Sequence, residues 1–101
     1  MTHNLNEQSP QNVQVSANDT IVLELDETPA TGYHWEITDI NKKDIELIDE
    51  EYQLYKQAGI GGGGKKIFKF RVVNKVGGHI LLENRQKWSG DVYKRFELSY
   101  S

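Results

Sequence analysis

The chain contains no cysteine and only two prolines among its 101 residues. The absence of cysteine excludes disulfides, thiol catalysis and thiolate metal sites, so packing alone must hold the core together. Long apolar runs are also missing, and none approaches the roughly 20 residues that cross a bilayer, so no membrane insertion is expected. The formal net charge is −3 and the lysines and arginines form no long block, so nucleic acid is not expected as a partner.

Arrangements typical of catalysis are missing as well. His3, His34 and His79 are scattered along the chain, and their spacing suggests neither a metal site nor a catalytic dyad. The 15 acidic residues form no paired-carboxylate arrangement, and no nucleophile, base and oxyanion site can be assembled. We therefore expect that the protein is not an enzyme and needs no cofactor.

Residues 1–12 are rich in asparagine, glutamine and serine and contain little that could be buried. This composition predicts a disordered N-terminal tail, followed by one folded domain over residues 13–101. The segment has neither a basic start nor an apolar h-region, so this form carries no secretory signal. That is compatible with a mature secreted or periplasmic protein.

Apolar and polar residues alternate along most of the remaining chain, and no stretch keeps a helical period. Strands are predicted near residues 13–16, 21–25, 33–38, 66–74, 80–83 and 93–100, with one or two weaker strands over 45–54 interrupted by acids at 49–51. Seven or eight short strands predict an all-β fold, an immunoglobulin-like antiparallel β-sandwich. The alternation places Tyr33 and Trp35 in its core.

Three loops between these strands are unusual. Thr28–Gly32 contains Pro29, which fixes its own φ, and residues 59–64 are rich in glycine, which allows close approach of a partner to the backbone. Arg85–Gly90 carries Trp88 in a polar setting, where an exposed tryptophan is typical of an interface hot spot. A sandwich can gather such loops at one end.

The glycine-rich loop nearly matches the phosphate-binding pattern G-x-x-x-x-G-K-[ST]. Lys66 stands where that pattern has a magnesium-binding hydroxyl, and the following residues alternate as a strand where the pattern needs a helix. Both differences count against nucleotide binding and favour an interface loop.

The stretch Thr-Pro-Ala-Thr-Gly-Tyr-His-Trp at residues 28–35 resembles the Asn-Pro-Thr-Thr-Gly-Tyr-x-Trp motif of the chagasin family, protein inhibitors of papain-like cysteine peptidases. The glycine-rich loop resembles that family's Gly-Gly-x-Gly motif, and residues 85–90 resemble its Arg-Pro-Trp loop. All three occur in the family's order, from about Val13 to the C-terminus. The resemblance implies a monomeric, reversible, tight-binding inhibitor that blocks the peptidase's active-site cleft.

By this resemblance, the first loop would enter the cleft near the catalytic cysteine, Trp88 would lie on the primed side, and the glycine loop on the other side. The implied peptidase-binding residues are Thr28, Pro29, Ala30, Thr31, Gly32, Gly61, Gly62, Gly63, Gly64, Arg85 and Trp88. Thr28 and Ala30 depart from the family motif, and Gln86-Lys87 replaces a single proline, which lengthens the third loop by one residue.

A different class of function is also compatible with the residues. An immunoglobulin-like sandwich can serve as an adhesion or carbohydrate-binding module without inhibitory activity, with Trp88 stacking on a sugar ring. The two functions make different demands on the first loop, because a sugar platform needs Trp88 but tolerates bulk at Thr31 or Gly32.

Overall fold

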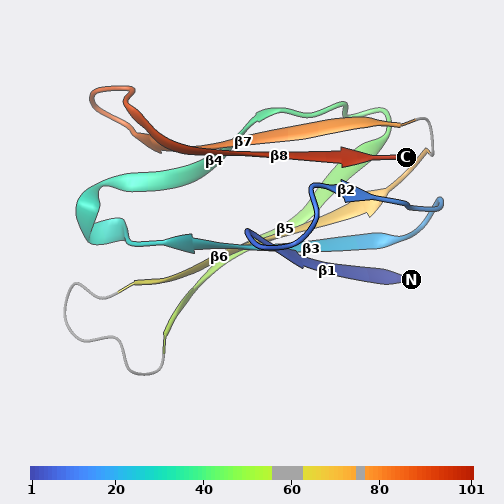
Figure 1. Cartoon of the computed structure of the whole chain (residues 1–101), viewed down its shortest axis with the longest axis horizontal. Helices are drawn as coiled ribbons and strands as arrows, with labels where there is room; N and C mark the ends of the chain where they lie inside the picture. Colours follow the sequence, from blue (N-terminus) through green and yellow to red (C-terminus); the bar gives the residue numbers. More distant parts are fainter. Residues whose placement is uncertain (56–62, 75–76) are drawn as a thin grey trace.

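Two four-stranded sheets pack face to face in a computed structural model that describes residues 1–55, 63–74 and 77–101, with only the backbone of Pro29 (Figure 1). One sheet has the order β1-β3-β6-β5 and the other β2-β8-β7-β4. The strands are β1 Thr2–Asn6, β2 Asn12–Val13, β3 Thr20–Glu27, β4 Tyr33–Asp39, β5 Ile45–Leu54, β6 Gly64–Val72, β7 Gly78–Gln86 and β8 Val92–Tyr100. This architecture confirms the predicted all-β sandwich. None of the described segments is a helix long and apolar enough to cross a membrane.

The core lies between the sheets and is built from the inward-facing positions of each alternating strand. Every second residue of β3 is fully buried from Ile21 to Leu25, and Phe68 and Phe70 on β6 stack with ring centroids 6.2 Å apart. Trp35 on β4 is only 3% exposed, which confirms its predicted place in the core. Tyr33 was also predicted there, but it is half-buried at the start of β4, where the strand leaves the first loop, and is not part of the core. Together these buried side chains hold the sandwich without any disulfide.

The N-terminal segment is ordered, contrary to the tail predicted for residues 1–12. Thr2–Asn6 forms β1, which pairs in parallel with β3, and Leu5 packs against the core. The Met1 ammonium lies 3.1 Å and the His3 imidazole 2.9 Å from the Asp19 carboxylate. The prediction was wrong because it rested on polar composition, whereas the segment is anchored by strand pairing, by one apolar side chain and by contacts with Asp19. The described fold therefore includes strands before residue 13, and β2 likewise pairs in parallel with β8.

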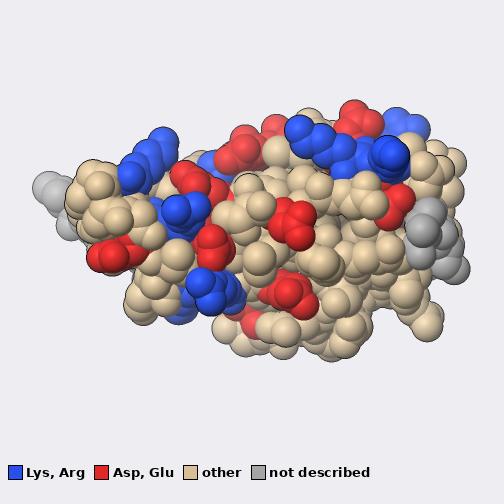
Figure 2. Space-filling view, turned by 90° about the horizontal axis from the view of Figure 1, so that it is seen from above, with Lys and Arg blue, Asp and Glu red and all other residues tan. Residues whose placement is uncertain are grey.

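The acidic run at residues 49–51 does not interrupt the fifth strand. Ile45–Leu54 forms one strand at the edge of its sheet, with a bulge between Leu47 and Asp49. Its acids are tolerated because they face solvent, and Glu50 pairs with Lys66 of β6 at 2.8 Å. Acidic and basic side chains are interspersed on the face seen in Figure 2.

The connections β3–β4 and β7–β8 lie at the end of the sandwich opposite both termini (Figure 1). The last residue of β5 and the first residue of β6 lie at the same end. We call this the loop end. Glu27, the last residue of β3, pairs there with Gly64, the first residue of β6, which in turn pairs with Leu54. The topology therefore brings the flanks of all three unusual loops to one end.

Candidate functional site

The first loop is a tight turn closed by its own hydrogen bonds. Residues Pro29–Thr31 form a short 3₁₀ turn, η1, in which the Thr31 N–H and the Thr31 hydroxyl both donate to the Thr28 carbonyl, at 3.1 and 2.7 Å. Gly32 follows with φ of +83°, a left-handed conformation that favours glycine. The turn then enters β4 at Tyr33. The loop is thus preset in one shape.

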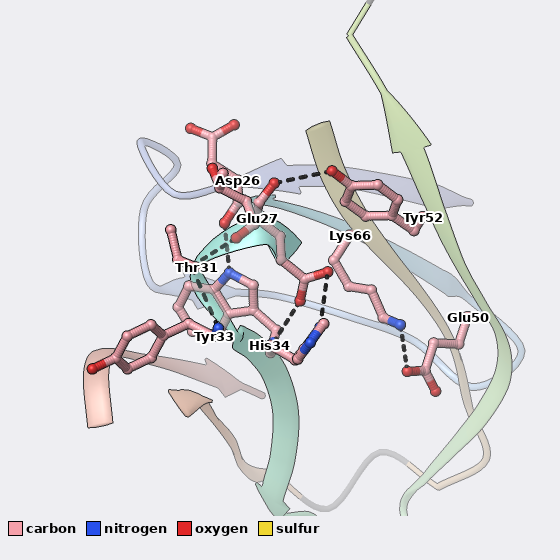
Figure 3. A network of polar contacts seen from close by, with 10 residues as sticks. Asp26, Glu27, Thr31, Tyr33, His34, Glu50, Tyr52 and Lys66 are labelled. Atoms are coloured by element: carbon pink, nitrogen blue, oxygen red, sulfur yellow. Dashed lines mark hydrogen bonds and ion pairs between the residues drawn. The ribbon is translucent and has the colours of Figure 1, made fainter. Parts of the chain in front are cut away.

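A buried carboxylate anchors this turn from beneath. Glu27 is 4% exposed, and its Oε1 accepts the Trp35 N–H at 2.6 Å, while the Trp35 indole Nε1 donates to the Asp26 carbonyl at 2.7 Å. His34 Nδ1 lies 3.8 Å from the other Glu27 oxygen (Figure 3). Because these bonds join the two residues before the loop to the strand after it, they fix the width of the loop at its base.

Sequence reasoning did not include Glu27 in the site. The signal was present, because Glu27 continues the inward register of Ile21, Leu23 and Leu25 on β3. A carboxylate at an inward position must find hydrogen-bond donors, and the start of β4 supplies one.

Two tyrosines of the β5 end tie the flank of the glycine-rich loop to the base of the first loop. The Tyr52 hydroxyl donates to the Glu27 carbonyl at 3.2 Å, and the Tyr55 hydroxyl donates to the Asp26 carboxylate. The bond to Asp26, aided by burial, raises the pKa of Tyr55 to about 12. Burial, with the Glu27 charge, also raises the pKa of Tyr52. Both hydroxyls are protonated at neutral pH, as tyrosines ordinarily are, and the raised pKa values keep them able to donate at higher pH as well.

Close backbone approach explains the glycines at the base of the second loop. A Cβ on Gly64 would overlap the Gln53 carbonyl and lie 2.6 Å from the Tyr52 hydroxyl. A Cβ on Gly63 would lie 3.0 Å from Oγ1 of Thr28, so this part of the second loop lies beside the first. Gly61 and Gly62, also predicted to bind the peptidase, fall outside the described residues.

The third loop is closed by bonds around Gln86. Its N–H donates to the Asp91 carbonyl at 2.9 Å, its carbonyl accepts the Gly90 N–H at 2.8 Å, and its side-chain oxygen accepts the Ser89 hydroxyl at 2.7 Å. Gly90 has φ of +74°. Although Gln86-Lys87 replaces a rigid proline, these bonds order the longer loop.

Trp88 projects from this loop and is 74% exposed, as predicted for an interface residue. One edge of its ring lies against the first loop, because a Cβ on Gly32 would overlap indole Cη2 and come within 2.8 Å of Cζ3. Arg85 is half-buried on β7, where it lies opposite His34 of β4. The structure thus places Trp88 against the first loop, whereas Arg85 belongs to the strand that precedes the third loop.

The predicted residues of the first loop differ in exposure. Ala30 and Thr31 are exposed at the tip, whereas Thr28 and Gly32 are half-buried between the other two loops. Within the described ranges, no group of three or more histidine, aspartate or glutamate side chains is arranged to hold a metal ion.

Comparisons with known proteins agree with this architecture. A family model described as "Chagasin family peptidase inhibitor I42" matches residues 14–100. A comparison with curated proteins found no match.

Two solved structures are similar over nearly the whole chain. The cysteine protease inhibitor EhICP2 from Entamoeba histolytica has a TM-score of 0.87 at 19% identity, covering 98% of this chain and 93% of that one. Amebosin, solved in solution, has a TM-score of 0.76 at 23% identity, covering 98% of this chain and 96% of that one. At these identities, the likeness shows a shared fold.

Proposed function

Because the chain belongs to the chagasin family of peptidase inhibitors, we propose that it inhibits papain-like cysteine peptidases by filling their active-site cleft with the three loops of the loop end. The observation that carries this proposal is the contact among the loops. The Trp88 ring lies against Gly32, and Gly63 lies beside Thr28, so the first loop adjoins the third loop on one side and the described end of the glycine-rich loop on the other.

The rigidity of the first loop supports a wedge that binds without chemistry. Thr31 uses both its N–H and its hydroxyl to close the turn, and Glu27 holds the base. A loop already held in its bound shape loses little conformational entropy on docking, so more of the contact energy appears as affinity.

The same turn geometry explains how the inhibitor would avoid becoming a substrate. A peptidase cleft takes extended backbone, whereas Pro29–Thr31 is coiled into a 3₁₀ turn and Gly32 is left-handed. A peptide bond in this loop would therefore be presented in a poor geometry for attack by the catalytic thiolate. Incubation with excess active papain followed by mass analysis should show the segment 28–33 intact.

The test is a titration of papain with this protein, following hydrolysis of a small fluorogenic peptide. We expect reversible inhibition with an equivalence point of one inhibitor per enzyme. Thr31→Arg adds bulk at the exposed tip, and Trp88→Ala removes the exposed ring, so each should raise Ki by about 30-fold or more, the effect of a hot-spot residue.

Val73→Ala is the matched control. Val73 is 42% exposed and follows the last residue of β6, at the end opposite the loops. The Ki of the Val73→Ala variant should therefore equal that of the unsubstituted protein. If the protein leaves papain and several related peptidases fully active, the proposal is wrong. Binding to glycans that needs Trp88 but tolerates Thr31→Arg would then favour the carbohydrate-binding function.

A further inference from the structure

A hollow of about 320 Å³ lies beside the first loop and extends beyond the three loop motifs. Its lining includes Thr28 and Thr31 of the first loop and Tyr33 at the start of β4. Tyr93 and Lys94, from the start of β8, complete this part of the wall. The hollow therefore extends the surface of the first loop onto a strand that the sequence motifs do not include.

A β-bulge places Tyr93 at this position. Along β7 the pairing passes from Asn84 to Arg85, while on β8 it passes from Lys94 to Val92. Tyr93 is thus the extra residue of the bulge, without a partner in the register of β7. A bulge interrupts the alternation of a strand and redirects a side chain, and such features are frequent beside functional sites.

The redirected ring is exposed and yet held in place. Tyr93 is 66% exposed, and its ring centroid lies 5.8 Å from that of Tyr33 at an interplanar angle of 54°. The Lys94 ammonium lies 5.4 Å from the centroid of the Tyr93 ring. Aromatic pairs and cations at such distances stabilise one ring orientation.

A large exposed aromatic side chain in a soluble protein indicates a contact surface when it adjoins another such residue or a site. Trp88 and Tyr93 are the two most exposed aromatic side chains among the described residues, and both adjoin the first loop. Tyrosine offers a large, rigid and amphipathic contact at little cost in conformational entropy, since only two side-chain torsions must be fixed.

We propose that Tyr93 is a fourth contact element of the inhibitor, an aromatic anchor that packs against the rim of the peptidase cleft when the first loop enters it. This inference rests on the proposed function, because the partner is the same peptidase. A protein surface that approaches the tip of the first loop meets Tyr93 across the hollow, where Thr31 and Tyr93 share one lining.

Two readouts test this inference, affinity and protection of the ring. Tyr93→Ala should raise Ki against papain by about 10-fold or more, whereas Tyr93→Phe, which keeps the ring, should stay within about 2-fold. Nitration by tetranitromethane, located by mass spectrometry, should modify Tyr93 in the free inhibitor and spare it in the complex. Protection distinguishes a contact from a purely structural role. If Tyr93 only supported Tyr33, its ring would stay accessible to the reagent in the complex.

The outcomes separate this inference from the proposed function. If the unsubstituted protein inhibits papain and Trp88→Ala weakens it, but Tyr93→Ala does not and Tyr93 is nitrated equally in the complex, the fourth contact is refuted and the three-loop wedge stands. If Ki rises for Tyr93→Ala without protection of the ring, Tyr93 is a positioning residue and the contact is again refuted. If papain is not inhibited at all, both proposals fail together.

Discussion

Replacement of Gly32 by alanine should damage the contact between the first and third loops. Gly32 has φ of +83°, and a Cβ there would overlap Cη2 of the Trp88 indole and lie 2.9 Å from Cζ2. Gly32→Ala therefore combines backbone strain with a steric conflict, and the conflict involves the ring that we propose to contact the peptidase.

The two effects have different sizes in stability and in binding. A side chain in the left-handed region costs roughly 1–2 kcal/mol, which lowers the melting temperature of a domain of this size by about 5–15 °C. The conflict adds little to this loss, because Trp88 is 74% exposed and can swing into solvent. Binding should suffer more, since the displaced ring is removed from the contact surface, and we expect Ki to rise by about 30-fold or more.

Two other glycines provide matched controls. Gly77 has φ of +93° at the opposite end of the sandwich, and a Cβ there would meet its nearest atom, the Tyr100 carbonyl oxygen, at 3.5 Å. Gly90 has φ of +74° within the third loop, with the nearest atom at 3.8 Å. Gly77→Ala should lose as much stability as Gly32→Ala and leave Ki unchanged. Gly90→Ala should lose a similar amount of stability without displacing Trp88.

Thermal unfolding followed by circular dichroism measures the melting temperature of each variant. Titration of papain, at a temperature where all variants are folded, measures Ki. Near-ultraviolet circular dichroism reports the environment of Trp88. If Gly32→Ala and Gly77→Ala lose the same stability and both retain full affinity, the contact between Gly32 and Trp88 has no role in binding and the reasoning is refuted.

Three further predictions concern the groups around the core. Glu27→Ala leaves the buried Trp35 N–H unpaired and should lower the free energy of unfolding by about 1–3 kcal/mol in urea denaturation; an unchanged midpoint would contradict the anchoring role. Asn84 Oδ1 is the one buried side-chain polar atom without a partner among the described residues, so Asn84→Leu should stabilise the protein by about 1 kcal/mol, and a loss would show that the oxygen is satisfied. Burial and the bond to Asp44 raise the pKa of Tyr100 to about 12, above its ordinary 10, so its contribution to stability is complete below pH 10 and is lost as pH rises through about 12. Tyr100→Phe should make stability less dependent on pH in that range, as measured by urea denaturation; an identical pH profile would contradict this.

The sandwich and the family could be predicted from the sequence because both depend on local patterns. Alternation places Ile21, Leu23 and Leu25 in the core, and the motif around Thr31 and Gly32 indicates the family that the comparison then confirmed. The inference that the chain is an inhibitor and not an enzyme is confirmed by the same assignment.

The parts that could not be predicted depend on contacts between distant residues. Leu5 and His3 look like members of a polar tail, but β1 pairs with β3 and His3 reaches Asp19. The bulge at Tyr93 follows from pairing between β7 and β8, which no local pattern displays. The contact between Trp88 and Gly32 likewise joins residues of two loops. Each requires the completed topology before it can be recognised.

The central claim is that the loop end occupies the active-site cleft, and alkylation of the peptidase thiol tests it most directly. Iodoacetamide modifies the catalytic cysteine of free papain rapidly, and the rate can be followed as loss of activity after the inhibitor is removed. We predict that the rate falls in proportion to added inhibitor and is nearly abolished at one equivalent, with Trp88→Ala giving weaker protection. Alkylation at the rate of the free enzyme, while binding is demonstrated by calorimetry, would show that the inhibitor binds outside the cleft and would contradict the account.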